Sequence, residues 1–256
     1  MTEDYTTVTE VPGISASREQ LSMLYTRYQM AAALSDGKDA LEVACGCGLG
    51  LGYLAKRTKR LVGGDYTEAL LRKARCHYGD RVPLVRLDGH VLPFRDQSFD
   101  VVILYEAIYY LAQPHKFLAE CRRVLRDGGV VLICTVNRQW ADFNPSSFSM
   151  KYFAARELRE LIRQEGFDVE LYGGFAVSMQ SARDRIVSLI KRAAVTLRLI
   201  PGTMKGKQLL KRLFFGKLTP LPSEVTEGMA EIYPLVPIDG NSIVACYKVL
   251  YTVGRL

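Results

Sequence analysis

The chain has 256 residues, of which 48% are hydrophobic and 24% charged, which fits one large globular domain and excludes a fibrous or disordered protein. No run of 18 apolar residues occurs, and the acidic N-terminus lacks the apolar segment of a secretory signal, so we expect a cytoplasmic protein. The six cysteines are scattered and lack the spacing of zinc ligands, so neither a metal site nor a disulfide framework is expected.

Short apolar runs alternate with amphipathic segments along the chain, and this alternation favours an α/β fold with a parallel sheet. The first amphipathic segment, 18–34, predicts a leading helix. Strands are predicted, in chain order, at 40–45, 61–64, 83–87, 99–105, 129–136 and 167–174. Further helices are predicted at 51–60, 67–78, 114–125 and 154–165. Residues 243–253, rich in β-branched and aromatic side chains, predict a last strand.

The segment 176–240 interrupts the hairpin between the last two predicted strands, and its charge is unusual. Residues 183–217 carry ten basic side chains and one acidic one, so the rest of the chain holds −2 of the total charge of +7. Three interpretations stay open: a helical face with its charges in solvent, a lid over an acceptor pocket, or a peripheral contact with an anionic membrane. In the last case each basic residue contributes about 1 kcal/mol. A nucleic-acid partner is disfavoured, because the neutral-to-acidic remainder offers no basic groove.

The stretch EVACGCG at 42–48 stands where the first parallel strand ends, at the position where doubly wound sheets bind ligands. Its small residues, including its two cysteines, allow a ligand to approach the backbone. Glu42 lies inside the strand end and needs a polar partner there. Asp65 and Asp88 follow the next two strands, and Asp65 could hold a ribose diol or could instead cap the following helix. Three carboxyl groups at neighbouring strand ends predict a nucleoside-like ligand.

Four motifs occur in order along residues 20–175: EVACGCG at 42–48, GGDY at 63–66, DGHVLPFRDQSFDVV at 88–102 and VLRDGGVVL at 124–132. Together they resemble the class I S-adenosylmethionine-dependent methyltransferases. The resemblance implies a Rossmann-like, doubly wound sheet of seven strands, mostly parallel, with an antiparallel last strand and a helical insertion before it. We therefore expect a single domain: a cofactor-binding core at 18–175, an acceptor-side insertion at 176–240 and the last strand at 241–256.

The resemblance also implies a set of contacts with the cofactor S-adenosylmethionine. Gly46 and Gly48 would face its methionine part, and Glu42 would orient its amino group. Asp65 would hold the ribose hydroxyls, and Asp88 would accept from the adenine amino group. The full set of predicted cofactor-binding residues is Tyr25, Tyr28, Glu42, Ala44, Gly46, Gly48, Asp65, Tyr66, Asp88, Gly89, His90 and Tyr105.

Two positions depart from the family pattern. Ala44 replaces the family's first glycine, a change that a backbone with φ below zero would absorb. Tyr110 stands where relatives often have a histidine after the fourth strand, so a general base is not inherited. Glu106, Tyr109 and Tyr110 are the catalytic candidates, although Glu106 could be merely a polar residue on the turn.

The sequence predicts an enzyme that transfers a methyl group from S-adenosylmethionine to a small molecule or to a lipid- or sugar-linked biosynthetic intermediate. One alternative is a scaffold that binds the cofactor without transfer activity, which Tyr110 in the histidine position would suit. Another is a nicotinamide-dependent oxidoreductase, because residues 50–55 match G-x-G-x-x-A. That match lies inside an expected helix rather than at the strand end, which disfavours it.

Overall fold

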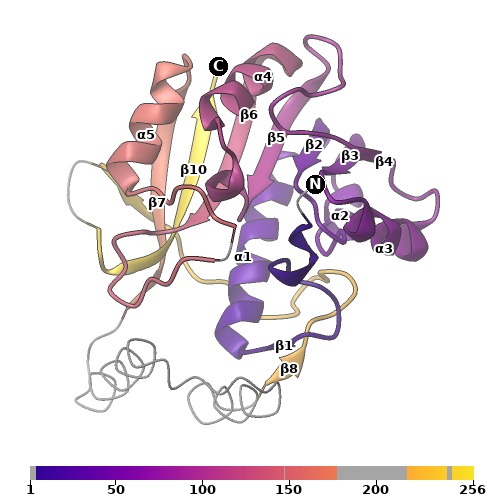
Figure 1. The fold of residues 1–256 in the computed structure, drawn as a ribbon, viewed down its shortest axis with the longest axis horizontal. Coiled ribbons are helices and arrows are strands. Elements are labelled where there is room, and N and C mark those ends of the chain that lie inside the picture. The colour runs from indigo at the N-terminus through magenta and orange to yellow at the C-terminus, as the bar shows by residue number, and fades with distance from the viewer. Residues whose placement is uncertain (1–3, 147, 178–217, 241–243) are drawn as a thin grey trace.

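A twisted sheet runs through the centre of the computed structural model, which describes residues 4–146, 148–177, 218–240 and 244–256 (Figure 1). Within these ranges the sheet has eight strands in the order β4-β3-β2-β5-β6-β10-β7-β9. Their bounds are β2 Asp39–Val43, β3 Arg60–Asp65, β4 Leu84–Arg86, β5 Phe99–Tyr105, β6 Leu125–Val136, β7 Asp168–Ala176, β9 Val236–Ile238 and β10 Tyr247–Arg255. Strands β2 to β6 pair in parallel, whereas β10 is antiparallel to both β6 and β7. The predicted doubly wound fold with an antiparallel last strand is confirmed.

Five α-helices of the described chain cover the two faces of this sheet: α1 Arg18–Leu34, α2 Leu51–Ala55, α3 Glu68–Tyr78, α4 Pro114–Val124 and α5 Ala155–Gln164. Successive residues of a strand point to opposite faces, and β5 shows the result. Val101 and Ile103 pack in the core with α1, α2 and α3, whereas Val102 and Leu104 pack in the core with α4 and α5. Both faces of the central strands are therefore buried.

Helix α1 begins at a reciprocal pair of hydrogen bonds. The Gln20 backbone N–H donates to Ser17 Oγ at 3.2 Å, and the Ser17 N–H donates to Gln20 Oε1 at 2.9 Å. Such a capping box satisfies two donors that a helix start leaves free. The buried side of the helix then places Tyr28 against the strand ends of the sheet.

The segment 176–240 is organised differently from the prediction where the structure describes it. Two short strands arise there: β9, at the edge of the main sheet, and β8 Thr219–Pro220, which pairs with β1 Ser15–Ala16. The sheet therefore has one strand more than the seven predicted. The basic segment 183–217 lies outside the described residues. Its interpretations as a solvent-facing helix, a lid or a membrane contact therefore stay predictions.

Two predicted boundaries also change. Helix α2 ends at Ala55 instead of residue 60. The predicted turn at 127–129 lies inside β6 as a bulge, where Gly128 has φ +73° and the register against β5 shifts. Among the described helices, none has the length and apolar character that crossing a bilayer requires.

The loop after β2 turns through left-handed backbone at alternate residues. Ala44 has φ +59°, Gly46 has φ +59° and Gly48 has φ +83°. The expectation of a negative φ at Ala44 is therefore wrong. The turn must bring the Cys45 N–H to the Gly64 carbonyl, 2.9 Å away on β3, and this geometry requires the conformation that glycine adopts more easily. An L-residue there is strained by about 1–2 kcal/mol.

We predict that Ala44→Gly raises the free energy of unfolding by about 0.5–1 kcal/mol, because the strain at positive φ is removed. Ala119→Gly is the matched control, since Ala119 is exposed within helix α4 and glycine there should cost about 1 kcal/mol. Urea denaturation of the three proteins at one pH measures both effects. A loss of stability in Ala44→Gly would contradict the strained conformation.

Candidate functional site

A cavity of about 480 Å³ opens at the carboxyl ends of β2, β3 and β5, where α1 and the N-terminal residues cover it. Its walls include Ala44 after β2, Asp65 at the end of β3 and Glu106 after β5. Cavities of several hundred Å³ hold cofactors and small substrates, and the carboxyl edge of a doubly wound sheet is where they bind. The segments that meet here are far apart in sequence.

Glu42 is a buried acid in the wall of this cavity, with only 1% of its surface exposed. The Tyr28 hydroxyl donates to its Oε1 at 2.6 Å. Its Oε2 is buried and has no hydrogen-bond partner. Burial raises the pKa of Glu42 to about 7, although the bond from Tyr28 and the charge of Arg27 act in the opposite direction. A cationic group placed beside Oε2 would satisfy this carboxylate.

Asp65 connects two loops. Its Oδ1 accepts from the Thr67 N–H at 2.7 Å and its Oδ2 accepts from the Gly46 N–H at 2.8 Å. The N-cap residue of helix α3 is Thr67, and no side chain caps the helix, so the interpretation of Asp65 as the helix cap is wrong. Asp65 instead holds the N-cap residue in place through its backbone N–H. It also fixes the glycine loop, and each carboxylate oxygen retains a further lone pair. Burial raises the pKa of Asp65, and the backbone hydrogen bonds oppose that shift.

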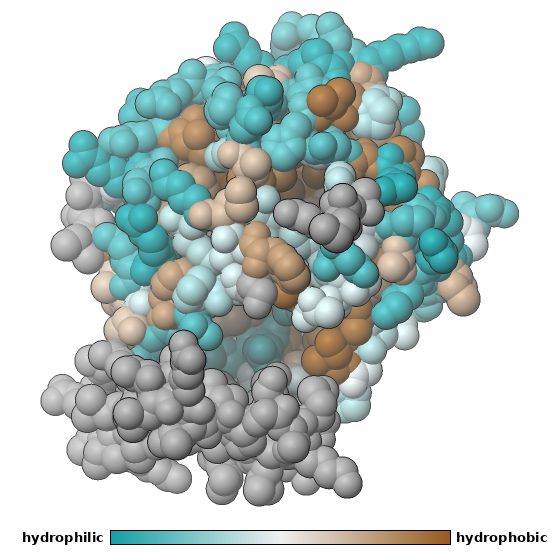
Figure 2. Space-filling view, viewed as in Figure 1, coloured by the Kyte–Doolittle hydropathy of each residue, from teal (hydrophilic) through white to brown (hydrophobic). Residues whose placement is uncertain are grey.

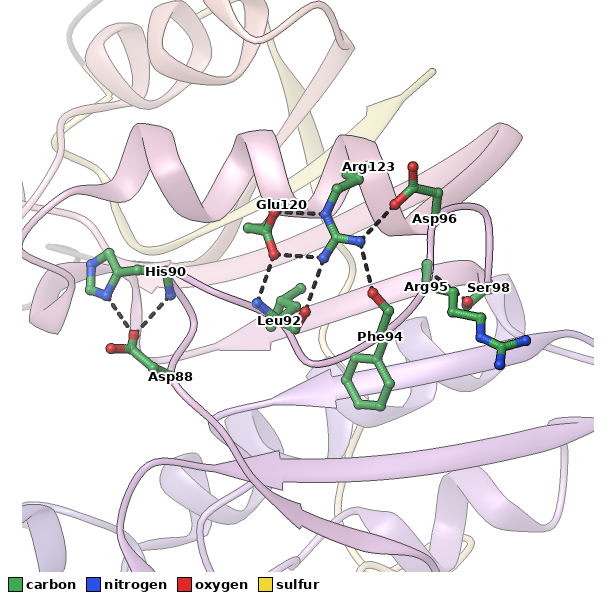
Figure 3. A network of polar contacts seen from close by, with 9 residues as sticks. All are labelled: Asp88, His90, Leu92, Phe94, Arg95, Asp96, Ser98, Glu120 and Arg123. Carbon is green, nitrogen blue, oxygen red and sulfur yellow. Dashed lines mark hydrogen bonds and ion pairs between the residues drawn. The ribbon is translucent and has the colours of Figure 1, made fainter.

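Asp88 and His90 form a turn at another part of the cavity wall (Figure 3). Asp88 Oδ1 accepts from the His90 backbone N–H at 2.9 Å and from its ring Nδ1 at 2.6 Å. The Gln113 N–H donates to His90 Nε2 at 3.3 Å, which leaves the ring proton on Nδ1. Partial burial opposes ionisation of Asp88, but the hydrogen bonds from His90 outweigh it and lower the pKa of Asp88. Its Oδ2 points away from His90 (Figure 3).

The loop that follows is held on helix α4 by Arg123 (Figure 3). The Arg123 guanidinium donates to both carboxylate oxygens of Glu120, to Asp96 Oδ1 and to the carbonyls of Leu92 and Phe94, all within 2.9 Å. The residues that follow His90 in the D-G-H-V-L-P-F-x-D motif therefore have a structural role. Their bonds with Arg123 hold the loop that carries Asp88 and His90 against helix α4.

Glu106 follows β5 with a backbone φ of +52°. The Tyr109 hydroxyl donates to Glu106 Oε2 at 3.2 Å, and the Cys134 thiol donates to Oε1 at 3.6 Å. Burial raises the pKa of Glu106 to about 7, and the positive charge of Arg27 acts in the opposite direction. Strained backbone and perturbed acids concentrate at functional sites, so this arrangement favours the interpretation of Glu106 as a working acid or base over that of a turn residue.

Aromatic rings form the wall beside Glu106. Tyr109 stacks on Tyr152 with ring centroids 4.3 Å apart. The Tyr110 hydroxyl shares a hydrogen bond of 2.7 Å with Ser146 Oγ, and its ring lies 5.1 Å from that of Tyr5. Tyr5 belongs to the 3₁₀ turn η1 Tyr5–Thr7, so the N-terminal segment closes this side of the cavity.

Arg27 and Glu10 line the cavity but were missed in the sequence. Arg27 is 8% exposed, and its guanidinium is paired with the Glu10 carboxylate at 2.5 Å. A signal did exist for Arg27, which shares with Leu24, Tyr28 and Ala31 the spacing of a buried helix stripe. Glu10 lies in irregular chain and has no such signal.

Most predicted site residues line the cavity, but two do not. The Tyr25 hydroxyl donates to Glu227 Oε1 at 2.7 Å, and a Cβ on Gly48 would meet the ring of Tyr78 at 2.8 Å. Neither residue lines the cavity, so their predicted contacts with a cofactor are wrong. Tyr25 bonds Glu227 instead, and Gly48 leaves room for the ring of Tyr78. The predicted residues in the cavity wall are Tyr28, Glu42, Ala44, Gly46, Asp65, Tyr66, Asp88, Gly89, His90, Tyr105, Glu106, Tyr109 and Tyr110.

The parts of the predicted insertion that the structure describes, 176–177 and 218–240, contribute no residue to the cavity wall. Residues 218–240 pack instead beside the glycine loop, where the Val225 N–H donates to the Leu49 carbonyl at 2.7 Å. Over the described ranges, no three His, Cys, Asp or Glu side chains are arranged as metal ligands.

Comparison with known proteins identifies the family. Residues 41–133 match the model of a methyltransferase domain. A probable S-adenosylmethionine-dependent methyltransferase of Mycolicibacterium smegmatis is 36% identical over 62% of this chain, which spans 63% of that relative's length. A phthiotriol/phenolphthiotriol dimycocerosates methyltransferase of Mycobacterium ulcerans is 32% identical over 79% of this chain and 72% of its own.

Solved structures agree on the fold. A Thermotoga maritima S-adenosylmethionine-dependent methyltransferase, described as a possible histamine N-methyltransferase, superimposes with a TM-score of 0.59 at 17% identity, over 93% of this chain and 91% of its own. At 17% identity that likeness shows the fold alone. The family assignment depends on the M. ulcerans relative, which is 32% identical and of which this chain covers 72%. The chain belongs to the class I S-adenosylmethionine-dependent methyltransferases.

Proposed function

We propose that this protein transfers a methyl group from S-adenosylmethionine to a hydroxyl group of a small-molecule or lipid-linked acceptor, with Glu106 as the general base. The observation that carries the proposal is the position of Glu106. Its carboxylate shares one cavity with Glu42, Asp65 and Asp88, and it lies next to a hydroxyl donor, Tyr109. An ordinary hydroxyl has to lose its proton to accept a methyl group, so a base at this place has a defined task.

The polar groups of the cavity fit the cofactor. The unpartnered Oε2 of Glu42 suits the amino group of the methionine part. Asp65 and Asp88 retain acceptor capacity for ribose hydroxyls and the adenine amino group. Gly46 lies close to the N-terminal segment, because a Cβ there would stand 3.0 Å from Thr9 Cγ2. The loop therefore has little room for a larger side chain at position 46.

The cofactor supplies the activated methyl group, and the residues of this chain supply orientation and proton transfer. Glu106 would take the acceptor's hydroxyl proton on a carboxylate oxygen, and Tyr109 would hold that carboxylate in place. The N-terminal turn that carries Tyr5 would exclude water from this side of the cavity. Orientation of the two reactants can contribute about 7–11 kcal/mol.

An apolar rim supports an acceptor with a hydrocarbon part. On the face drawn in Figure 2, hydrophobic side chains form separate patches among hydrophilic ones. Scattered patches of this kind are usual on protein surfaces and do not by themselves indicate a binding site. Phe148, 53% exposed, differs because its ring lies 6.2 Å from Tyr5 of the cavity wall. Met150, 65% exposed, bonds through its N–H to the Tyr109 carbonyl. The name of the M. ulcerans relative places that protein's acceptor among dimycocerosate lipids, which agrees with such a rim.

We predict that the protein transfers labelled methyl from S-adenosylmethionine to long-chain diols or alkylphenols and not to matched alkylamines. Glu106→Gln should lower kcat by about 100-fold or more and leave the Kd for S-adenosylhomocysteine nearly unchanged. Because Glu106 acts as a base when ionised, and its pKa is about 7, kcat should rise between pH 6 and pH 8 in the native protein and stay flat in the variant. Glu170→Gln, which alters a carboxylate outside the cavity, is the control.

Binding of the cofactor without transfer to either acceptor panel would favour the scaffold alternative. Transfer to amines alone, with unchanged kcat in Glu106→Gln, would show that no base is used.

A second prediction concerns Glu42. Its pKa of about 7 means that the ionised fraction rises about tenfold between pH 6 and pH 8, so affinity for S-adenosylhomocysteine should rise by a similar factor. Glu42→Gln should bind at least about tenfold more weakly at pH 8 and lose the pH dependence. Isothermal titration calorimetry across this pH range measures both. An unchanged affinity in Glu42→Gln would contradict the assignment.

The same carboxyl group predicts how stability without ligand depends on pH. Its pKa rises from 4.5 in the unfolded chain to about 7 in the folded protein, so the folded state binds more protons in this window. The contribution of Glu42 to the free energy of unfolding should fall as pH rises from 4.5 to 7 and level off above 7. Glu42→Gln should remove this part of the pH dependence in urea titrations. A native protein and variant with parallel stability profiles would contradict the raised pKa.

A further inference from the structure

Two buried atoms of opposite charge lack partners in the same cavity. Arg27 is paired with Glu10 through Nη2, but its Nε has no hydrogen-bond partner. Glu42 is paired with Tyr28 through Oε1, but its Oε2 has none. Tyr28 links the two, because the Arg27 guanidinium lies 5.7 Å from the centre of its ring. Both residues belong to the cavity wall, which therefore includes one buried cationic donor and one buried anionic acceptor without hydrogen-bond partners.

An unpaired buried donor or acceptor costs about 1–3 kcal/mol, and more when it belongs to a charged group. Other buried side-chain atoms without partners in this cavity are the Tyr105 and Tyr251 hydroxyls, which are neutral at ordinary pH. Arg27 and Glu42 thus provide the charged pair. An α-amino acid group carries one ammonium and one carboxylate, and it matches this pair in both sign and number.

We infer that Arg27 binds the α-carboxylate of the cofactor's methionine part while Glu42 binds its ammonium group, and that Glu10 is a resident counter-ion which the carboxylate displaces. This inference rests on the cofactor of the proposed function and adds the residues that recognise its amino acid end. Arg27 stays charged at every relevant pH, and its planar guanidinium can hold a carboxylate through two N–H groups.

Glu10 is suited to such an exchange. Its side chain is 43% exposed, whereas that of Arg27 is 9% exposed, so Glu10 can turn into water while Arg27 stays in the cavity wall. The same segment contacts the glycine loop, because the Cys47 thiol donates to the Glu10 carbonyl at 3.3 Å. Arrival of the cofactor's carboxylate would thus release the side chain of Glu10 without detaching its backbone.

The test compares two ligands that differ in one group. S-adenosylhomocysteine carries both the ammonium and the carboxylate, and S-adenosyl-3-thiopropylamine lacks only the carboxylate. Calorimetry should show that Arg27→Met weakens S-adenosylhomocysteine by about 10- to 100-fold and changes the Kd of the thiopropylamine by less than about twofold. Arg27→Lys should recover part of the loss, and Arg18→Met, an exposed arginine on the same helix, should change neither Kd.

Glu42→Gln supplies the opposite pattern, because both ligands carry the ammonium group and both should weaken. Glu10→Gln should raise the affinity for S-adenosylhomocysteine relative to the thiopropylamine, since the competing carboxylate is gone. Equal weakening of both ligands by Arg27→Met would overturn the assignment of Arg27, and an unchanged ratio in Glu10→Gln would overturn the exchange. If the native protein bound neither ligand, the proposed function itself would fail, which is a different result.

Discussion

The Asp65 carboxylate bonds to the backbone N–H groups of Gly46 and Thr67, and the shape of the cavity depends on this pair of hydrogen bonds. One bond fixes the loop after β2 and the other fixes the loop after β3. Because the strands are parallel, both loops leave the sheet at the same edge, where Glu106 follows β5. A single buried carboxylate thus sets the distance between two loops of the cavity wall.

Several acidic side chains line the cavity, and their negative charges need positive partners. Glu42 and Glu106 both have their pKa raised to about 7 by burial, and Arg27 opposes the shift in each case. A buried carboxylate without a cationic partner is costly, so the acids are poised for a ligand that brings positive charge. The sulfonium and ammonium groups of S-adenosylmethionine are such charges. The electrostatics and the family assignment therefore agree on independent grounds.

Sequence patterns predicted the regular elements well. Helix α1 and strand β5 have the predicted bounds, 18–34 and 99–105, because periodicity and side-chain type report directly on burial in long elements. Strand β9 was missed because it has three residues, one of them Pro237, and its pairing with β7 is a long-range contact. No local pattern reports such a pairing.

The candidate site was predictable where a residue type and a strand end coincide. Glu42, Asp65, Asp88 and Glu106 were found in this way, and all four line the cavity. Tyr25 and Tyr28 look equivalent on the predicted helix, yet one faces Glu227 and the other Glu42, a difference that tertiary packing decides. The ion pair of Arg27 with Glu10 joins a helix to irregular chain, so local sequence carried no sign of it.

Ala44 and Glu106 both have a positive φ, and they follow two neighbouring parallel strands. The two positions differ in which substitutions they tolerate. At position 44 a glycine relieves the strain and removes nothing else but a methyl group. At position 106 a glycine would also remove the carboxylate, and a β-branched residue would fit the left-handed region poorly. Few residue types combine that backbone with an ionisable side chain. If the carboxylate of residue 106 takes part in proton transfer, only a narrow set of residue types can occupy this position.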